Sequence, residues 1–358
     1  MSGTTGPATL DTTSGDAVLA PVRRSTVGED LGTLLVSLWL TAGLFLDGYA
    51  HDHLLTGKES FFTPWHAVFY SGFAATVAWL GLIVSRRLAP PRPMWSCLPV
   101  GYRSAGVGVA VFAFGGVGDA LWHTRFGFER SDEALFSPTH LLLFAGLVLI
   151  VSAPFRAASA LPSGRIVQWS QFWLPMGSLV LTTAIVAFFS VWGLASRDLL
   201  RVRYDVATGS GEAALLAGVA SELVATVILM SAVLIVVRRW QPPSATFTLL
   251  FTTVAAAFAL AFSGETQGVF AAFAGGVVVD LALAAPMFGR MDNATTRTAS
   301  AAALGPVAMW SMYHLLLHSS GDLAWSAPLA AGTPILAGLT GLGLFALTNA
   351  PPRTERVS

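Results

Sequence analysis

Long apolar stretches recur along the whole chain, and they restrict the fold more than any other feature. A bilayer core of about 30 Å requires about 20 apolar residues per helix. About ten segments satisfy this requirement, namely residues 32–50, 64–85, 100–123, 138–155, 169–191, 213–237, 245–264, 268–288, 298–318 and 327–349. Backbone polar groups in lipid must be paired internally, and the sequence has no β-barrel alternation, so these segments predict α-helices. With only 11% charged residues, the chain is expected to be an all-α polytopic integral membrane protein.

The two ends of the chain differ from this apolar body. Residues 1–30 are rich in Ser, Thr, Gly and Asp, and residues 351–358 are also polar, so both are expected to be disordered tails. Residues 31–350 should form a single transmembrane helical domain. The single Cys97 excludes an intrachain disulfide and a Cys-rich metal site. The net charge of zero gives no reason to expect a nucleic-acid partner.

The basic residues predict the orientation in the membrane. If the N-terminus is cytoplasmic, 14 of the 20 Lys and Arg residues fall on the cytoplasmic side and 6 on the other. The positive-inside rule therefore favours ten helices in the cell membrane, with both termini cytoplasmic.

Two of the segments that connect these helices are copies of each other. The first reads LDGYAHDHLLTGKESFFTPWHAVFYSG (46–72), and the second reads GDALWHTRFGFERSDEALFSPTHLLLFAG (118–146). Each contains an Asp, a His four residues later, a loop with a Glu, and then Phe-[Ser/Thr]-Pro-x-His. The surrounding repeat units span about 32–86 and 100–156 and share one orientation. The sequence therefore predicts a parallel duplicated helix pair.

The duplicated side chains are of metal-ligand type. Residues four apart lie on one face of a helix, so the Asp and the first His of each copy should point the same way. Ser or Thr before Pro is typical of a helix N-cap, which places the later His in the first turn of the next helix. Imidazole and carboxylate suit a transition metal. The expected ligands, as two sets or as one dinuclear cluster, are Asp47, His51, His66, Asp119, His123 and His140.

Further candidates lie at the same predicted membrane face. His314 and His318 are one helical turn apart, a common chelating arrangement, and are expected to complete the site or to bind a second metal. Glu59 and Glu133 are candidate catalytic residues, ligands or orienting partners of an imidazole, or simply acids favoured by a helix N-terminus. The remaining candidates at this face are His53, Glu265 and Asp322.

Two acids lie deep in apolar runs. Glu222 and Asp280 are costly at that depth and are therefore functional candidates, for instance in a proton path. The structural alternative is an acid that forms hydrogen bonds with a neighbouring helix.

The second copy resembles the metal-binding stretch in the C subunit of the copper membrane monooxygenases, which oxidise methane or ammonia. That stretch runs Asp-x-x-Trp-His, a polar loop, and Phe-[Thr/Ser]-Pro-[Ser/Thr]-His. The matching residues here are Asp119, Trp122, His123, Phe136, Ser137, Pro138, Thr139 and His140. The resemblance implies copper ligation by Asp119, His123 and His140. The loop is longer here and the motif is duplicated, so no substrate follows from the resemblance.

Three classes of function fit these residues. The leading one is a metal-dependent membrane oxidoreductase, with copper or alternatively iron, that activates dioxygen at the outer face to oxidise a small or lipid-soluble substrate. It would need an electron donor or partner subunit, because the chain has no visible cofactor motif. The second is a zinc-dependent intramembrane hydrolase of a lipid amide or ester. The third is a non-enzymatic metal carrier or sensor.

Overall fold

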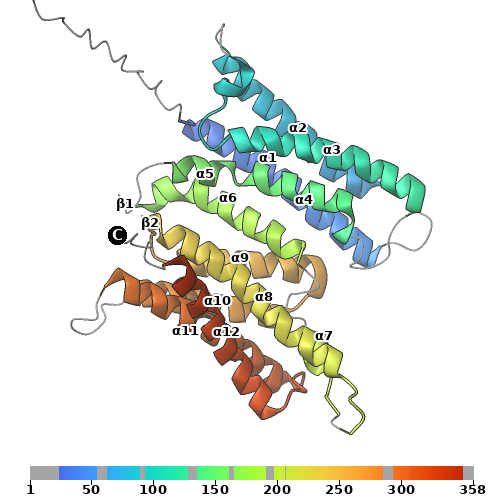
Figure 1. The fold of residues 1–358 in the computed structure, drawn as a ribbon, viewed down its shortest axis with the longest axis vertical. Coiled ribbons are helices and arrows are strands. Elements are labelled where there is room, and N and C mark those ends of the chain that lie inside the picture. Colours follow the sequence, from blue (N-terminus) through green and yellow to red (C-terminus); the bar gives the residue numbers. More distant parts are fainter. Residues whose placement is uncertain are drawn as a thin grey trace, which may run out of the picture.

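A computed structural model describes residues 24–54, 63–88, 93–127, 135–160, 165–190, 197–205, 207–284 and 293–349 (Figure 1). Its helices are α1 (Val27–His53), α2 (Pro64–Arg87), η1 (Met94–Cys97), α3 (Arg103–Phe126), α4 (Pro138–Val151), α5 (Ala153–Ser159), α6 (Trp169–Phe188), α7 (Arg197–Arg201), α8 (Glu212–Val237), α9 (Thr246–Phe258), η4 (Ala259–Ser263), α10 (Thr266–Ala284), α11 (Ala294–Ser320) and α12 (Ala327–Thr348). Two short strands, β1 (Arg165–Ile166) and β2 (Trp240–Gln241), pair in parallel. The predicted helical fold class is confirmed for the described residues.

Every apolar stretch that was predicted to span the membrane contains a helix. Among the residues that the structure describes, seven helices are long and apolar enough to cross a bilayer, namely α1, α2, α3, α6, α8, α10 and α12. Helices α4 and α5 make an eighth if they count as one span, bent by 46°. Helix α9 is shorter, and α11 is not among the seven. The multi-pass membrane class is therefore confirmed, whereas the number of ten spans stays a prediction.

The first helix begins earlier than the sequence suggested. The Thr26 side chain accepts a hydrogen bond from the backbone N–H of Glu29 (3.2 Å), and the Glu29 carboxylate accepts one from the backbone N–H of Thr26 (2.7 Å). This capping box satisfies two of the N–H groups that a helix start leaves unpaired. Residues 27–30, predicted to belong to the tail, are therefore helical.

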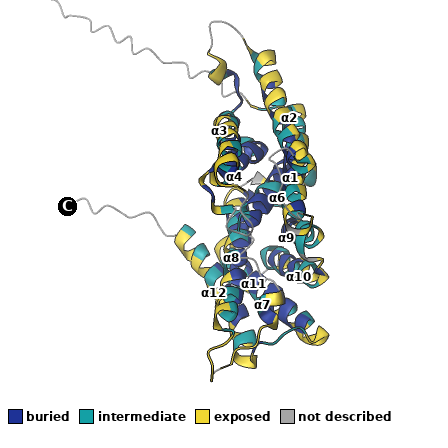
Figure 2. Cartoon of the chain, turned by 90° about the vertical axis from the view of Figure 1, so that its right-hand side faces the viewer, coloured by how far each residue is buried: buried dark blue, intermediate teal, exposed yellow. Residues whose placement is uncertain are grey.

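The helices form two groups on either side of α6. Figures 1 and 2 show α1 to α4 in one half of the molecule and α8 to α12 in the other. Helix α6 contacts α1, α4 and α5 on one side and α8 and α9 on the other. Each half has its own buried apolar cluster, the first around Phe69 and Phe112 and the second around Phe247 and Phe251. The duplicated motifs thus belong to the first half.

Glycines hold the two helices of each duplicated pair close together. A Cβ atom added at Gly72 on α2 would lie 2.9 Å from the Cα of Leu40 on α1. At the equivalent Gly146 on α4, it would lie 2.7 Å from the Cβ of Phe112 on α3. Leu40 and Phe112 are themselves equivalent in the repeat. Small residues at such positions let helix backbones approach closely in lipid.

The other helix of each pair, α1 or α3, also contributes a glycine to the close contact. A Cβ atom added at Gly43 on α1 would lie 2.7 Å from the Cα of Phe69, and one at Gly115 on α3 would lie 3.0 Å from the backbone nitrogen of Leu143. Phe69 and Leu143 are equivalent positions. The duplication therefore extends from the polar motifs to the packing that brings their helices together.

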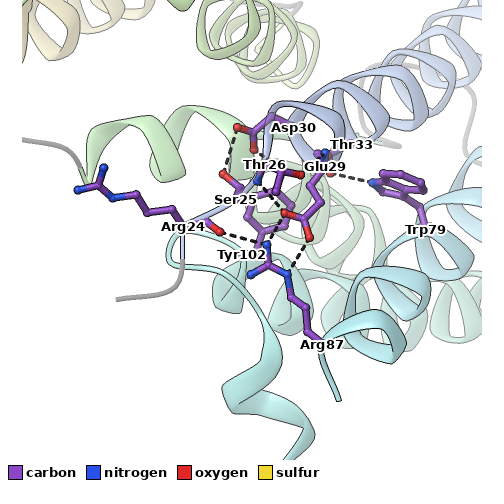
Figure 3. Close-up of polar contacts among 9 residues, drawn as sticks. All are labelled: Arg24, Ser25, Thr26, Glu29, Asp30, Thr33, Trp79, Arg87 and Tyr102. Carbon is purple, nitrogen blue, oxygen red and sulfur yellow. Dashed lines mark hydrogen bonds and ion pairs between the residues drawn. The ribbon is translucent and has the colours of Figure 1, made fainter. Parts of the chain in front are cut away.

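Polar contacts join α1 to α2 at the end opposite the duplicated motifs (Figure 3). The Arg87 guanidinium, at the end of α2, donates hydrogen bonds to both carboxylate oxygens of Glu29, from Nε at 2.7 Å. The indole N–H of Trp79 donates to the Thr33 hydroxyl at 3.0 Å. These bonds fix the register of the first helix pair.

A second contact at this end joins α1 to the start of α3 (Figure 3). The Tyr102 hydroxyl donates to Asp30 at 2.6 Å. Burial, reinforced by the Asp30 carboxylate, raises the pKa of the Tyr102 phenol above its ordinary value, so the hydroxyl stays protonated and donates. The two duplicated pairs are therefore tied together through α1.

Replacing Gly146 by Val tests the close helix contact. The added Cβ must displace the Phe112 backbone, whose nitrogen would lie 2.8 Å away, and such overpacking costs about 1–3 kcal/mol or more. At Gly81 on α2, an added Cβ meets no atom within 4 Å, so Gly81→Ala should be neutral or stabilise the helix by up to ~1 kcal/mol. Thermal unfolding in detergent, followed by circular dichroism, measures both. An equal unfolding temperature for the two variants would contradict the close contact.

Candidate metal centre

The first predicted ligand set is assembled as a compact triad. Asp47 and His51 lie on the last turns of α1, and His66 lies in the first turn of α2. The Asp47 carboxylate is 3.8 Å from His51 Nε2 through one oxygen and 3.5 Å from His66 Nε2 through the other. The three ligand atoms all lie within 4.8 Å of one another. His66 is buried and His51 is exposed.

The second set repeats this arrangement on α3 and α4. Asp119 Oδ1 is 3.4 Å from His123 Nε2 and 3.4 Å from His140 Nε2. The two imidazole rings are 5.8 Å apart, the same centroid distance as between His51 and His66. Asp119 and His123 are buried, so this triad is the more enclosed of the two.

The separation of the donor atoms fits a bound cation. Two ligand atoms at about 2.1 Å from a tetrahedral metal ion lie about 3.4 Å apart. Three of the four nitrogen–oxygen distances, at 3.4–3.5 Å, agree with this value, and the fourth, from His51 to Asp47, is 3.8 Å. All four exceed the length of an ordinary N–H···O hydrogen bond. Each triad offers two imidazole nitrogens and one carboxylate, which is a suitable donor set for a transition metal.

Neighbouring groups orient the imidazoles of the second triad. His123 Nδ1 is 3.2 Å from the carbonyl oxygen of Gly127, and His140 Nδ1 is 2.7 Å from the Ser137 hydroxyl. A proton on each Nδ1 satisfies these contacts and leaves the Nε2 lone pair facing Asp119. The Thr139 hydroxyl donates to Asp119 Oδ1 at 3.1 Å. Such outer contacts fix ring orientation and raise ligand basicity.

The predicted N-caps position the second histidine of each triad. The Thr63 hydroxyl accepts from the backbone N–H of His66 (3.1 Å), and the Ser137 hydroxyl accepts from that of His140 (3.2 Å). Pro follows each cap at the first helical position. The prediction that both histidines lie in a first helical turn is confirmed.

The two triads are neighbours, and Tyr70 lies between them. His51 is close enough to His123, His140 and Asp119 to interact with them electrostatically. The Tyr70 hydroxyl interacts with the carboxylates of both Asp119 and Asp47. The ring of Tyr70 approaches α3 at Gly116, where an added Cβ would lie 3.0 Å from it. The duplication therefore yields two adjacent ligand sets rather than two remote ones.

The sequence pattern assigned no role at the site to Tyr70 or Gly127, and it included Thr139 only as part of the motif resemblance. Tyr70 lies four residues after His66, on the same helical face, which is the one signal that could have identified it. Its counterpart in the second copy is Phe144, which stacks on Phe189 at 4.6 Å instead. The two copies therefore differ at this position, and Tyr70 lies on the side of α2 that faces the triad of Asp119.

The structure does not bring His314 to the triads. His314 lies on α11 in the other half of the molecule (Figure 2), with Nε2 2.6 Å from Glu222 Oε1 and Nδ1 2.8 Å from the carbonyl oxygen of Ala330. A separation of 2.6 Å is a direct hydrogen bond and is too short for two ligands of one metal ion. His314 and Glu222 therefore form a buried carboxylate–imidazole pair, which corresponds to the structural alternative for Glu222.

The candidates His318, His53 and Asp322 lie outside both triads. His318 is exposed near the end of α11, and the His53 ring stacks on Tyr49 at 4.4 Å. The Asp322 carboxylate accepts from Arg201 Nε at 2.8 Å. None of these belongs to a triad within the described residues.

Asp280 caps a helix. Its carboxylate accepts hydrogen bonds from the backbone N–H groups of Phe247 (3.2 Å) and Thr248 (2.9 Å) at the start of α9. It also accepts from the Thr248 hydroxyl at 2.7 Å. Because residue 245, before α9, is an alanine without a side-chain acceptor, an acid from α10 replaces the usual cap.

Glu59 and Glu133, the candidate catalytic acids, lie outside the residues that the structure describes. Their roles stay predictions. Comparison of the chain with protein-family models, with curated proteins and with solved structures finds no match.

Elemental analysis of the purified protein tests the ligand assignment. The double variant His123→Ala/His140→Ala removes both imidazoles of the more enclosed triad and should lose the metal held there. His318→Ala, an exposed histidine outside both triads, serves as the control and should retain the native metal content. Unchanged metal content in the double variant would contradict the assignment.

Variants of Glu222 test the buried pair that it forms with His314. Glu222→Ala leaves the buried His314 imidazole without its hydrogen-bond partner, which costs about 1–3 kcal/mol, so this variant should lower the unfolding temperature. Glu222→Gln keeps a hydrogen-bond acceptor for His314 and should cost less. Both variants should keep the native metal content. Loss of metal in Glu222→Ala at unchanged stability would instead make Glu222 a ligand.

Proposed function

We propose that this protein is a metal-dependent membrane oxidoreductase, and that copper is its metal. The single observation that carries the proposal is the pair of neighbouring triads, each with two imidazoles and a carboxylate at the separation expected across a bound cation. The resemblance of the second copy to the C subunit of the copper membrane monooxygenases supports copper in particular. Bound copper would supply the capacity to activate dioxygen.

The protein's own residues have distinct parts in this proposal. The Nε2 atoms of the four triad histidines and the carboxylates of Asp47 and Asp119 hold the metal. Thr139 fixes the Asp119 carboxylate by a hydrogen bond of 3.1 Å. The Tyr70 hydroxyl, which interacts with both carboxylates, is placed to hold or pass a proton between the two ligand sets.

The proposed orientation places the triads at the outer face of the membrane. The contacts of Figure 3, which include Arg24 and Arg87, lie at one end of α1 and α3. The triads lie at the opposite end of these helices. Basic residues favour the cytoplasmic side, so the triads face outward. A substrate that is small or lipid-soluble can reach this level from the bilayer, and electrons would come from a separate donor or partner subunit.

The donor set also suits zinc, which binds imidazole and carboxylate in tetrahedral geometry. This fit supports a second candidate, a zinc-dependent hydrolase of a lipid amide or ester. Its chemistry would be attack by a zinc-bound water on the carbonyl group. The metal in the purified protein distinguishes the two candidates.

Dioxygen uptake tests the oxidoreductase proposal. Copper-supplied membranes containing the native protein, given a quinol as reductant, should consume dioxygen faster than membranes containing His123→Ala/His140→Ala. His318→Ala should match the native rate. Equal uptake by native protein and double variant, together with tightly held zinc, would overturn the proposal and favour the hydrolase.

A further inference from the structure

An apolar cavity lies in the second half of the molecule, and none of the residues that line it belongs to a triad. It has a volume of about 140 Å³, is partly open, and is lined by residues of α6, α8, α9, η4, α10 and α11. Its walls are formed by side chains such as Leu229, Phe251, Phe258, Ala272 and Met309. An apolar concave space of this size is a candidate small-molecule site.

One carboxyl group faces this apolar space. Glu265 lines the cavity and is only 9% exposed, and Tyr313, which is 2% exposed, lines it too. The Tyr313 hydroxyl donates to Glu265 Oε2 at 3.0 Å. A carboxylate accepts hydrogen bonds at about four lone-pair positions, so Glu265 can hold Tyr313 and a ligand donor together.

The backbone beside Glu265 is irregular. The end of α9 widens into the π-helical turn η4, and Gly264 follows with a φ of 63°. π-helical turns within helices are frequent at functional sites because they redirect side chains. Here the turn ends directly before Glu265 and contributes Ala259 to the cavity wall.

We propose that this cavity is a binding site for a compact apolar molecule that carries one hydrogen-bond donor, such as a hydroxyl group. An apolar cavity of about 150 Å³ holds a benzene-sized molecule, which sets the size of the ligand. The apolar walls hold the body of the ligand, and the Glu265 carboxyl group accepts its hydrogen bond. Few polar groups on apolar walls are typical of small-molecule sites.

The residues that line the cavity are distinct from those of the two triads. The rings of Phe45, Phe188, Phe258 and Phe262 form a cluster with centroid distances of 5.3–6.1 Å around Phe45. Phe258 lines the cavity, whereas Phe45 belongs to α1, the helix that carries Asp47. This aromatic cluster therefore lies between the cavity and α1.

Gly268 provides a variant that fills the cavity without disturbing the fold. It lines the cavity, and an added Cβ meets no atom within 4 Å. Gly268→Leu should place its side chain in the empty space, and Leu also favours the helix over Gly. Gly81→Leu is the matched control, because Gly81 also has no atom within 4 Å of an added Cβ but lies on α2, outside the cavity.

The probe is 4-fluorobenzyl alcohol, observed by ¹⁹F NMR with the full chain in lipid nanodiscs. Because all samples contain the same lipids, differences between variants report the protein site. We expect saturable binding to the native protein and to Gly81→Leu, and at least about tenfold weaker binding to Gly268→Leu. Equal signals from all three proteins would overturn the proposal. Thermal unfolding of each variant checks that it is folded.

4-Fluorotoluene tests the part assigned to Glu265, because it has the same body without the hydroxyl group. We expect the native protein to bind it about tenfold more weakly than the alcohol, relative to partition into the same lipids. Glu265→Leu, which removes the acceptor, should abolish this preference for the alcohol. Equal binding of the two probes by the native protein would overturn the assignment of Glu265.

Discussion

A carboxylate shared by two imidazoles is the interaction on which the rest of the first half depends. Asp119 is buried within a helical membrane protein, where an isolated charge is costly to desolvate. Two imidazole nitrogens and the Thr139 hydroxyl surround it. A cation among these donors would provide the compensating charge. The carboxylate and the two imidazoles recur around Asp47, which is partly buried, and this repetition favours a functional reason over an accident of packing.

The packing of the helices explains how such a site can form at one membrane level. Reciprocal glycine contacts draw each helix pair together, and a hydroxyl cap followed by proline begins the second helix of each pair close to the end of the first. Contacts of Arg87 with Glu29 and of Tyr102 with Asp30 fix the opposite end. The ligand-bearing helix ends of each pair are therefore positioned by packing, as precise sites require.

The helical fold and the two triads could be predicted because their signals are local. Apolar length predicts a membrane helix, a hydroxyl before proline predicts a cap, and repetition separates a ligand set from solitary polar residues. The pairing of His314 with Glu222 could not be predicted, since a spacing of four within one helix carries no information about the helix that faces it. The same limit applies to Asp280, whose partner is the start of another helix, and to Tyr70, which looks like an ordinary aromatic until α3 is placed beside it.

The most direct test of the central claim is anomalous diffraction from crystals of the protein grown with copper, measured at the copper absorption edge. We expect anomalous density among Asp119, His123 and His140, within about 2.0–2.2 Å of the ligand atoms, and equivalent density in the triad of Asp47. Crystals with both triads ordered and no anomalous density at either, or with density only at His314 and His318, would contradict the claim.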